Sequence, residues 1–223
     1  MITKETLQYL KDLKKNNNRI WFIANKPRYD MARAEFEKFV SRLILEIACF
    51  DPTIGELEAK RCIFRIYRDT RFSRNKIPYK INFGAHLVAH ESKVHDRAGY
   101  YVHLEPGNNF LAGGAYLPPA PWLNAIRRAI DQNGRKLDQI MNDPSFKKYF
   151  AELEGEKLKT TPRDYPANHP YIELLRFKSF TAWHPLSNQK VLADNFLKHC
   201  VEVFAALKPF NDFLNRSISA DLL

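Results

Sequence analysis

The 223-residue sequence has few of the residues on which disulfide-bonded or metal-stapled proteins depend. Its three cysteines, Cys49, Cys62 and Cys200, lie far apart and form no CxxC pair, which argues against a zinc ribbon and against thioredoxin-like chemistry. A chain of this length buries about 70% of its unfolded surface, so it needs no cross-link for stability. We therefore expect a reduced, cytoplasmic protein.

Glycine and long apolar runs are also scarce. Only 8 glycines are present, and neither GxGxxG nor GxxxxGK[ST] occurs, so the phosphate loops of the common nucleotide-binding folds are missing. No apolar run approaches the eighteen or more residues of a membrane span, and the first residues lack the apolar core of a signal peptide. These absences favour a soluble protein without membrane association.

The positive charge, in contrast, is abundant and concentrated in one segment. The chain carries a formal charge of +10, and residues 60–80 contain eight lysines and arginines against a single acid, Asp69. A solvated surface normally mixes charges of both signs. The segment therefore either repels itself or faces an anionic partner.

The hydrophobic pattern changes its period along the chain. Helical spacing predicts helices over residues 3–15, 36–47 and 119–134, shorter ones near 137–141 and 146–153, and a last one from about 187. Alternation predicts strands over residues 61–67, 79–90, 100–105 and 110–112, and one more within 171–184. We expect one α+β domain over residues 1–223, with a central antiparallel or mixed sheet flanked by helices.

Single residues and short runs give further local predictions. Asn133-Gly134 is expected to end a helix, and Pro209 to break or kink the last one. The apolar residues 20–23 are expected to pack beneath the helix that follows them. The Gly113-Gly114 pair inside a strand predicts a bulge or a close approach of another backbone.

A series of short motifs runs through nearly the whole chain. The densest is RIYRDTRFS at 65–73, followed by PYK at 78–80 and FGA at 83–85; NNNR at 16–19, GYY at 99–101, HLEPG at 103–107 and PRDY at 162–165 complete it. Together they resemble a family of conserved hypothetical proteins known as a domain of unknown function. The chain departs from the family pattern at Ile20, where an acid is expected. The resemblance implies a single α+β domain but supplies no reaction and no cofactor.

The basic segment supplies the candidate ligand-binding residues. Arginine forks and lysine ammonium groups bind phosphate or carboxylate, and aromatic rings stack on the organic part of a ligand. We expect a basic, aromatic-lined cleft for a phosphorylated or otherwise anionic small molecule. Its expected residues are Arg65, Arg68, Arg71, Lys76, Tyr79, Lys80 and Tyr101. The alternative is that Asp69 pairs with Arg68 or Arg71 and that the aromatic rings belong to the core.

Two other functions stay open at this point. The basic segment could follow the phosphate backbone of a nucleic acid. Alternatively, His103 and Glu105, on one face of a predicted strand and about 7 Å apart, could serve an enzyme as acid and base together with Tyr101. The cysteines have no catalytic signature around them, and no G-x-S-x-G elbow is present.

We expect neither a metal nor a cofactor. His86 and His90 have the spacing of a helical zinc site, but on the predicted strand their rings would lie roughly 13 Å apart. The sequence leaves the oligomeric state open.

Overall fold

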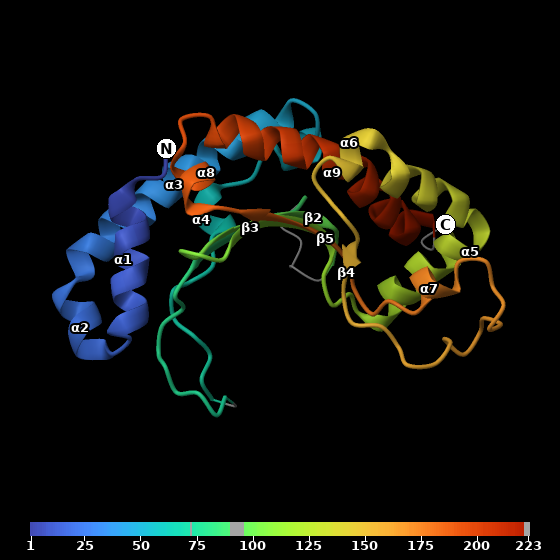
Figure 1. Ribbon diagram of the computed structural model, residues 1–223, viewed down its shortest axis with the longest axis horizontal. Coiled ribbons are helices and arrows are strands. Elements are labelled where there is room, and N and C mark those ends of the chain that lie inside the picture. The colour runs from blue at the N-terminus through green and yellow to red at the C-terminus, as the bar shows by residue number, and fades with distance from the viewer. Residues whose placement is uncertain (72, 90–95, 221–223) are drawn as a thin grey trace. The chain divides into compact units, whose positions relative to one another are not determined.

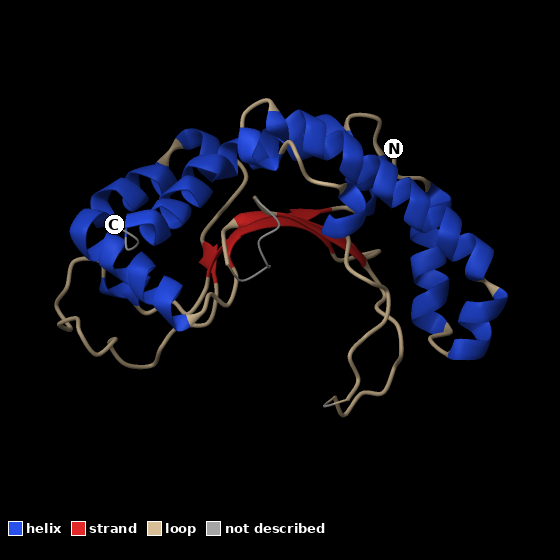
Figure 2. Cartoon of the chain, turned by 180° about the vertical axis from the view of Figure 1, so that it is seen from behind, coloured by secondary structure: helices blue, strands red, loops and turns tan. Residues whose placement is uncertain are grey.

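The computed structural model describes residues 1–71, 73–89 and 96–220 (Figure 1). It confirms an α+β chain with an antiparallel sheet (Figure 2). The described strands pair in the order β1-β2-β3-β5-β4. Their bounds are β1 Phe83–Leu87, β2 Gly99–Leu104, β3 Asn109–Ala115, β4 Leu153–Glu154 and β5 Phe180–Leu186. Residue 72 of the motif at 65–73 and the expectations for His90 lie outside the described residues.

Contacts group the chain into two compact units. Unit 1 holds residues 1–87, 101–111 and 185–202, and unit 2 holds residues 88–100, 112–184 and those from 203 onward. Strands β2, β3 and β5 and helix α9 contribute residues to both units. The expectation of a single domain over residues 1–223 stays a prediction.

Unit 1 contains most of the chain's N-terminal half. Its helices are α1 Lys4–Lys15, α2 Arg19–Ala24, α3 Lys26–Ala48, the 3-10 turn η1 Pro52–Ile54, α4 Ala59–Cys62, α8 Asn188–Leu192 and the start of α9 Phe196–Ala220. Helix α1 begins where the Thr3 side chain accepts a hydrogen bond from the backbone N–H of Thr6. The apolar stripe of α3 is buried as expected, with Phe36 stacked on Phe83 and Phe39 stacked on Phe196.

The side chains of β2 divide between two environments. Val102 and Leu104 are fully buried, whereas Tyr101, His103 and the following Glu105 are only partly buried. A strand turns successive side chains to opposite faces, so the two apolar residues place the three polar ones together on the other face. The predicted strand over residues 100–105 is thereby confirmed, together with its alternation.

The predicted strand over residues 61–67 is wrong. Residues 59–62 form helix α4, and Ile63 and Tyr67 make only isolated bridges to Ala85 and Tyr79. The reason is a change of partner: Phe64 bonds to Gly84, whereas the next residues bond to 78–80. Since Pro78 also lacks a backbone N–H, no continuous ladder forms along one neighbour.

The expectation for residues 20–23 holds only in part. These residues belong to the six-residue helix α2, in which Phe22 is buried but Ile20 is 84% exposed. A helix turns 100° per residue, so four successive apolar residues cannot all face the same neighbour. Ile20 and Ile23 therefore lie in solvent.

Unit 2 contains α5 Ala120–Asn142, α6 Pro144–Lys147, α7 Ile172–Leu175 and most of α9. Asn133-Gly134 does not end a helix: Asn133 has φ −146° and ψ 41°, and α5 continues beyond this kink. Pro209 lies inside α9, which is not broken there. Phe204 and Phe210 of α9 pack against Tyr100 and Phe146, respectively.

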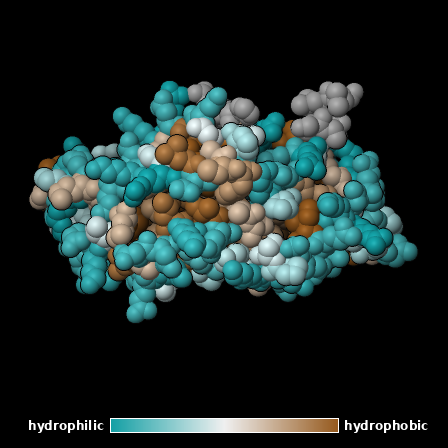
Figure 3. Space-filling model, turned by 90° about the horizontal axis from the view of Figure 1, so that it is seen from above, coloured by the Kyte–Doolittle hydropathy of each residue, from teal (hydrophilic) through white to brown (hydrophobic). Residues whose placement is uncertain are grey.

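The face in Figure 3 is mainly hydrophilic, with apolar side chains in separate patches, as expected for a chain with 27% charged residues. Among the described residues, no helix combines the length and the apolar character that crossing a bilayer requires.

The Gly113-Gly114 pair yields a stability prediction. Gly114 has φ +111°, and a Cβ there would overlap the carbonyl oxygen of Phe180. We expect Gly114→Ala to lower the free energy of unfolding by about 3 kcal/mol or more, because backbone strain and overlap act together. Gly107→Ala is the matched control: φ is +89°, but nothing lies within 4 Å, so only the strain of about 1 kcal/mol applies. Urea denaturation measures both losses, and equal losses would contradict the role of the Phe180 contact.

Candidate functional site

The basic segment folds into an arm at the base of β1, which we call the basic arm (residues 63–71 and 73–80, within the teal loop of Figure 1). Its two halves lie side by side. The backbone N–H of Arg68 donates to the Pro78 carbonyl at 2.9 Å, and that of Lys80 donates to the Ile66 carbonyl at 2.7 Å. The positive charges of the segment are thus carried on a defined backbone in unit 1.

Part of this charge is neutralised within the arm. Arg71 Nε donates to Asp69 Oδ1 at 3.0 Å, and Arg71 Nη2 donates to Asp69 Oδ2 at 2.7 Å. The two-pronged pairing lowers the pKa of Asp69 and raises the pKa of Arg71. The structure thus contains the Asp69–Arg71 ion pair that the sequence offers as an alternative to ligand binding. This pair engages the Arg71 guanidinium, which the predicted anion clamp would need for its ligand.

Two further cations of the arm hold backbone carbonyls. Arg68 Nη1 donates to the Ile77 carbonyl at 3.3 Å, and Lys76 Nζ donates to the Thr70 carbonyl at 2.9 Å. Arg68 and Arg71 therefore contact different groups within the arm, and the clamp expected from Arg65, Arg68 and Arg71 stays a prediction.

Tyr79 belongs to the core of unit 1. Its ring is 5% exposed and stacks on Phe22 with centroids 4.0 Å apart. The side-chain amide of Asn17 binds the Tyr79 backbone twice. Its Oδ1 accepts from the Tyr79 N–H at 3.1 Å, and its Nδ2 donates to the Tyr79 carbonyl at 3.0 Å. This burial gives the Tyr79 ring an anchoring role in unit 1, and the ligand contact expected for Tyr79 stays a prediction.

Arg65 and Lys80, in contrast, form a pair of like charges. Burial, and after it the charge of Arg65, lower the pKa of Lys80. Lys80 Nζ lies 5.0 Å from the centroid of the Phe64 ring, in cation–π contact. Among the residues that the structure describes, neither cation has an acidic partner within ion-pair distance. Lys80 is partly buried and Arg65 is exposed, so the Arg65–Lys80 pair is a positive site without an acidic partner among the described residues.

A chain of hydrogen bonds runs along the partly buried face of β2. Tyr101 Oη lies 2.9 Å from His103 Nδ1, and His103 Nε2 lies 3.3 Å from Glu105 Oε2. The side chains of His103 and Glu105 are 12% and 15% exposed. The structure thus brings together the three residues that the alternation of the sequence places on one face.

The environment sets the charges of this chain. Burial lowers the pKa of His103, and the bond to Glu105 offsets this only in part, so the imidazole is neutral near pH 7. For Glu105, burial raises the pKa, but hydrogen bonds from Asn108, His103 and Lys14 outweigh it and leave the pKa below its usual value. A neutral imidazole therefore lies beside an ionised carboxylate.

Neighbouring rings fix these side chains in place. Phe110 of β3 stacks on His103 with centroids 4.4 Å apart and planes at 14°. Phe64, which carries Lys80 on its face, lies 6.1 Å from the Tyr101 ring. A Cβ on Gly84 would lie 2.7 Å from Tyr101 Oη, so only glycine leaves room for the hydroxyl there. The Arg65–Lys80 pair and the Tyr101 chain are therefore linked through Phe64.

Three residues of this site were not predicted from the sequence. Asn82 Nδ2 lies 3.4 Å from His103 Nδ1, Asn108 Nδ2 donates to Glu105 Oε2 at 3.3 Å, and Lys14 Nζ lies 3.4 Å from Glu105 Oε1. The HLEPG and turn motifs bring Asn108 near Glu105 in the sequence. No sequence signal points to Lys14, which comes from α1, ninety-one positions away.

The described part of the chain offers no cluster of metal ligands, and two of its three cysteines are buried. Within it, no group of three or more His, Cys, Asp or Glu side chains could hold a metal ion. His86 lies on β1, and its proposed partner His90 is outside the described residues. Burial raises the pKa of Cys62 to about 11, and Cys200 is fully buried, so both thiols are unreactive.

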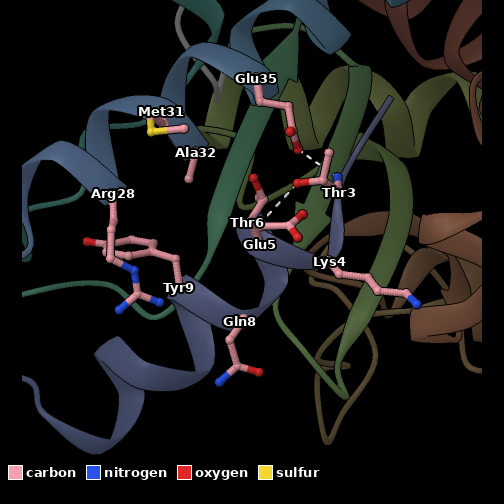
Figure 4. A pocket seen from close by; sticks show the side chains of 10 residues that line it. All are labelled: Thr3, Lys4, Glu5, Thr6, Gln8, Tyr9, Arg28, Met31, Ala32 and Glu35. Atoms are coloured by element: carbon pink, nitrogen blue, oxygen red, sulfur yellow. Dashed lines mark hydrogen bonds between the residues drawn. The ribbon is translucent and has the colours of Figure 1, made fainter.

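A hollow of about 630 Å³ lies between α1 and α3 (Figure 4). Its lining mixes charges, with Lys4 and Arg28 against Glu5 and Glu35. Glu35 is held by the backbone N–H of Thr3 at 2.7 Å. This balance gives no preference for an anion, so size alone does not make the hollow the functional site.

A second hollow, of about 400 Å³, lies in unit 2 and is lined by all four residues of the PRDY motif. Arg127, Arg128 and Arg163 line it together with Asp164 and Tyr165. Arg127 is already engaged, because its Nε donates to the Leu175 carbonyl at 2.9 Å and its Nη2 to the Phe177 carbonyl at 3.3 Å. This hollow is a competing anion site, and an experiment has to distinguish binding there from binding at the Arg65–Lys80 pair.

Comparison with known proteins confirms the family to which the sequence is expected to belong. A family of conserved hypothetical proteins, DUF2461, matches residues 5–213, and the chain belongs to this family. No curated protein and no solved structure matches the chain. The description of the family names no reaction, ligand or partner, so the function has to be argued from the site.

The state of His103 gives a pH prediction. Since its pKa is lowered in the folded chain, the unfolded chain takes up a proton first as the pH falls below about 6.5, and stability is lost from there downward. His103→Gln removes this loss. We expect the difference in unfolding free energy between the wild type and His103→Gln to be constant above pH 7. Below pH 6.5 it should fall by at most about 1.4 kcal/mol per pH unit in urea titrations. A difference that does not change with pH would contradict the neutral imidazole.

Proposed function

We propose that this member of the DUF2461 family binds a small anionic ligand, a phosphate ester or a carboxylate, at the Arg65–Lys80 pair beside Tyr101. The observation that supports the proposal is the pair itself: two cations placed together, one of them partly buried, without an acidic neighbour among the described residues.

Such an arrangement costs stability unless something compensates it. Like charges repel, and the partial burial of Lys80 removes water that would otherwise screen the repulsion. A bound anion would reverse both effects, since it attracts each cation and replaces the missing solvation. The cost paid by the unliganded chain is thus explained by affinity for an anion.

The surroundings favour a small organic anion. Arg65 offers a planar fork that matches phosphate or carboxylate, and Lys80 offers a point charge. Phe64 and Tyr101 supply apolar surface next to these charges, and the Tyr101 hydroxyl adds a polar contact. An ion with an organic part can use all of these groups, whereas an inorganic ion uses only the charges.

The Lys80→Met variant separates stability from binding. It removes a partly buried charge but keeps most of the chain length, so we expect the melting temperature without ligand to stay equal or rise. Inorganic phosphate at about ten times its Kd should stabilise the wild type by about 1.4 kcal/mol, and this increment should disappear in Lys80→Met. Thermal unfolding with and without phosphate measures both quantities.

Two control variants localise the effect. Arg74→Met removes an exposed charge from the same arm, and Arg163→Met removes one from the hollow in unit 2. Both should keep the phosphate increment, whereas the general salt stabilisation by phosphate is common to all variants. Loss of the increment in Arg163→Met but not in Lys80→Met would overturn the proposed location.

A nucleic acid is the second candidate, and the exposed part of the basic arm favours it. Arg74 and Lys76 are exposed there, and Tyr67 is 53% exposed. Exposed cations next to an exposed ring suit a single strand, whose phosphates and bases they can contact.

The salt dependence of binding tests this candidate. If a single strand lies on the arm, the logarithm of its affinity should fall linearly with the logarithm of salt concentration. Arg74→Met and Lys76→Met should each reduce the slope by about 0.7. Fluorescence anisotropy with a labelled oligonucleotide gives the slopes, and slopes that these variants leave unchanged would reject the arm as a nucleic-acid surface.

A further inference from the structure

We infer that Tyr101 exchanges a proton with the bound anion and that His103 and Glu105 form the relay that takes up the proton of its hydroxyl. The inference rests on the proposed function, because it needs an anion at the Arg65–Lys80 pair. It adds a catalytic role for Tyr101 and positioning roles for His103 and Glu105. The class of ligand is an anionic molecule that carries an acidic O–H or C–H bond.

The partners of His103 determine which of its nitrogens carries the hydrogen. An ionised carboxylate only accepts hydrogen bonds, so the Nε2 that faces Glu105 must be the donor. A neutral imidazole then has a lone pair on Nδ1. The Tyr101 hydroxyl, 2.9 Å away, and the Asn82 amide, 3.4 Å away, both face this lone pair. Tyr101 therefore donates to His103.

This polarity gives the relay its direction. When the O–H bond of Tyr101 breaks, the proton forms a new bond to His103 Nδ1, and the imidazolium lies beside the Glu105 carboxylate. The phenolate oxygen then takes a proton from the ligand, so the Tyr101 O–H bond is restored. In the balance, the ligand loses one proton and His103 gains it. The reverse sequence returns the proton to the product.

The environment supports a reversible transfer. Burial makes His103 a weak base, and the Glu105 carboxylate stabilises the charged form at the moment when it arises. Stacking on Phe110 and the hydrogen bond from Asn108 to Glu105 keep both side chains in line. These groups have the roles of base and orienting carboxylate that a hydroxyl nucleophile requires, with a phenol in place of an alcohol.

The described groups that face His103 come from several elements. Tyr101 and Glu105 lie on its own strand or directly after it, Asn82 precedes β1, and Phe110 lies on β3. Lys14 of α1 reaches the imidazole only through Glu105. Among the described residues, the titratable groups in contact with the ring are the relay partners Tyr101 and Glu105, so a change in the pKa of His103 reports on the relay.

The test uses nuclear magnetic resonance of the histidine ring nitrogens in the full chain. Without ligand at pH 7.5, we expect neutral His103 with its hydrogen on Nε2. A hydrogen on Nδ1, or a doubly protonated ring, would overturn the relay whether or not an anion binds. This measurement therefore distinguishes a failure of the relay from a failure of the proposed binding function.

A second measurement adds inorganic phosphate as the probe and follows the pKa of His103. In the wild type the pKa should rise, because a protonated His103 lets Tyr101 turn its hydroxyl toward the phosphate. In Tyr101→Phe the phosphate affinity should stay within about tenfold, but the rise should fall to a small through-space remainder. Tyr67→Phe removes an exposed hydroxyl from the basic arm and should keep the full rise.

Each result of the phosphate titration either supports or overturns the proposal. An equal rise in the wild type and in Tyr101→Phe would show that charge alone acts on His103, and it would overturn the role of Tyr101. Absence of phosphate binding in the wild type would contradict the proposed function and, with it, the proton exchange. The position of the ring hydrogen would still be known from the measurement without ligand.

Discussion

The alternation of side chains along β2 is the constraint on which the candidate site depends. Val102 and Leu104 are fully buried, and their burial fixes the register of the strand. A shift by one residue would bury His103 and Glu105 and expose the two apolar side chains. The hydrophobic effect on one face therefore holds Tyr101, His103 and Glu105 in line on the other. The polar chain needs no separate device to align it, only neighbours such as Phe110 and Gly84 that match its shape.

The distribution of positive charge follows from where acids are available. In the basic arm, Asp69 is two residues from Arg71 and neutralises it directly, while Arg68 and Lys76 hold backbone carbonyls. At the base of the arm no acid of the described chain reaches Arg65 or Lys80, and Phe64 provides only the face of its ring. A count of charges along the sequence treats all these residues alike. The fold separates those that stabilise the arm from those that retain an unsatisfied charge.

The sequence predicts the features that depend on regular spacing. The stripe from Phe36 to Ile47 predicted α3, and the alternation after Gly99 predicted β2 and the shared face of Tyr101, His103 and Glu105. It did not predict that the backbone after Cys62 changes its hydrogen-bonding partner from Gly84 to residues 78–80. Alternation of apolar residues indicates an extended segment but does not say which segment it pairs with. Asn82 and Lys14 were missed because their contacts with the site arise only from tertiary packing. The burial of Tyr79 also arises from tertiary packing, so its neighbours in the sequence left the core and the ligand-contact interpretations both open.

Residues that lower stability and residues that serve the proposals coincide in this chain. Lys80 is a cation kept partly buried beside another cation, and His103 is an imidazole kept from protonation by burial. Apolar side chains at both positions would avoid these costs, because a buried polar or charged group is stabilising only when it is fully compensated. Asp69 and Arg71, which compensate each other, need no ligand to explain them. Lys80 has no acidic partner among the described residues, and this difference is the reason for placing the proposed anion beside it.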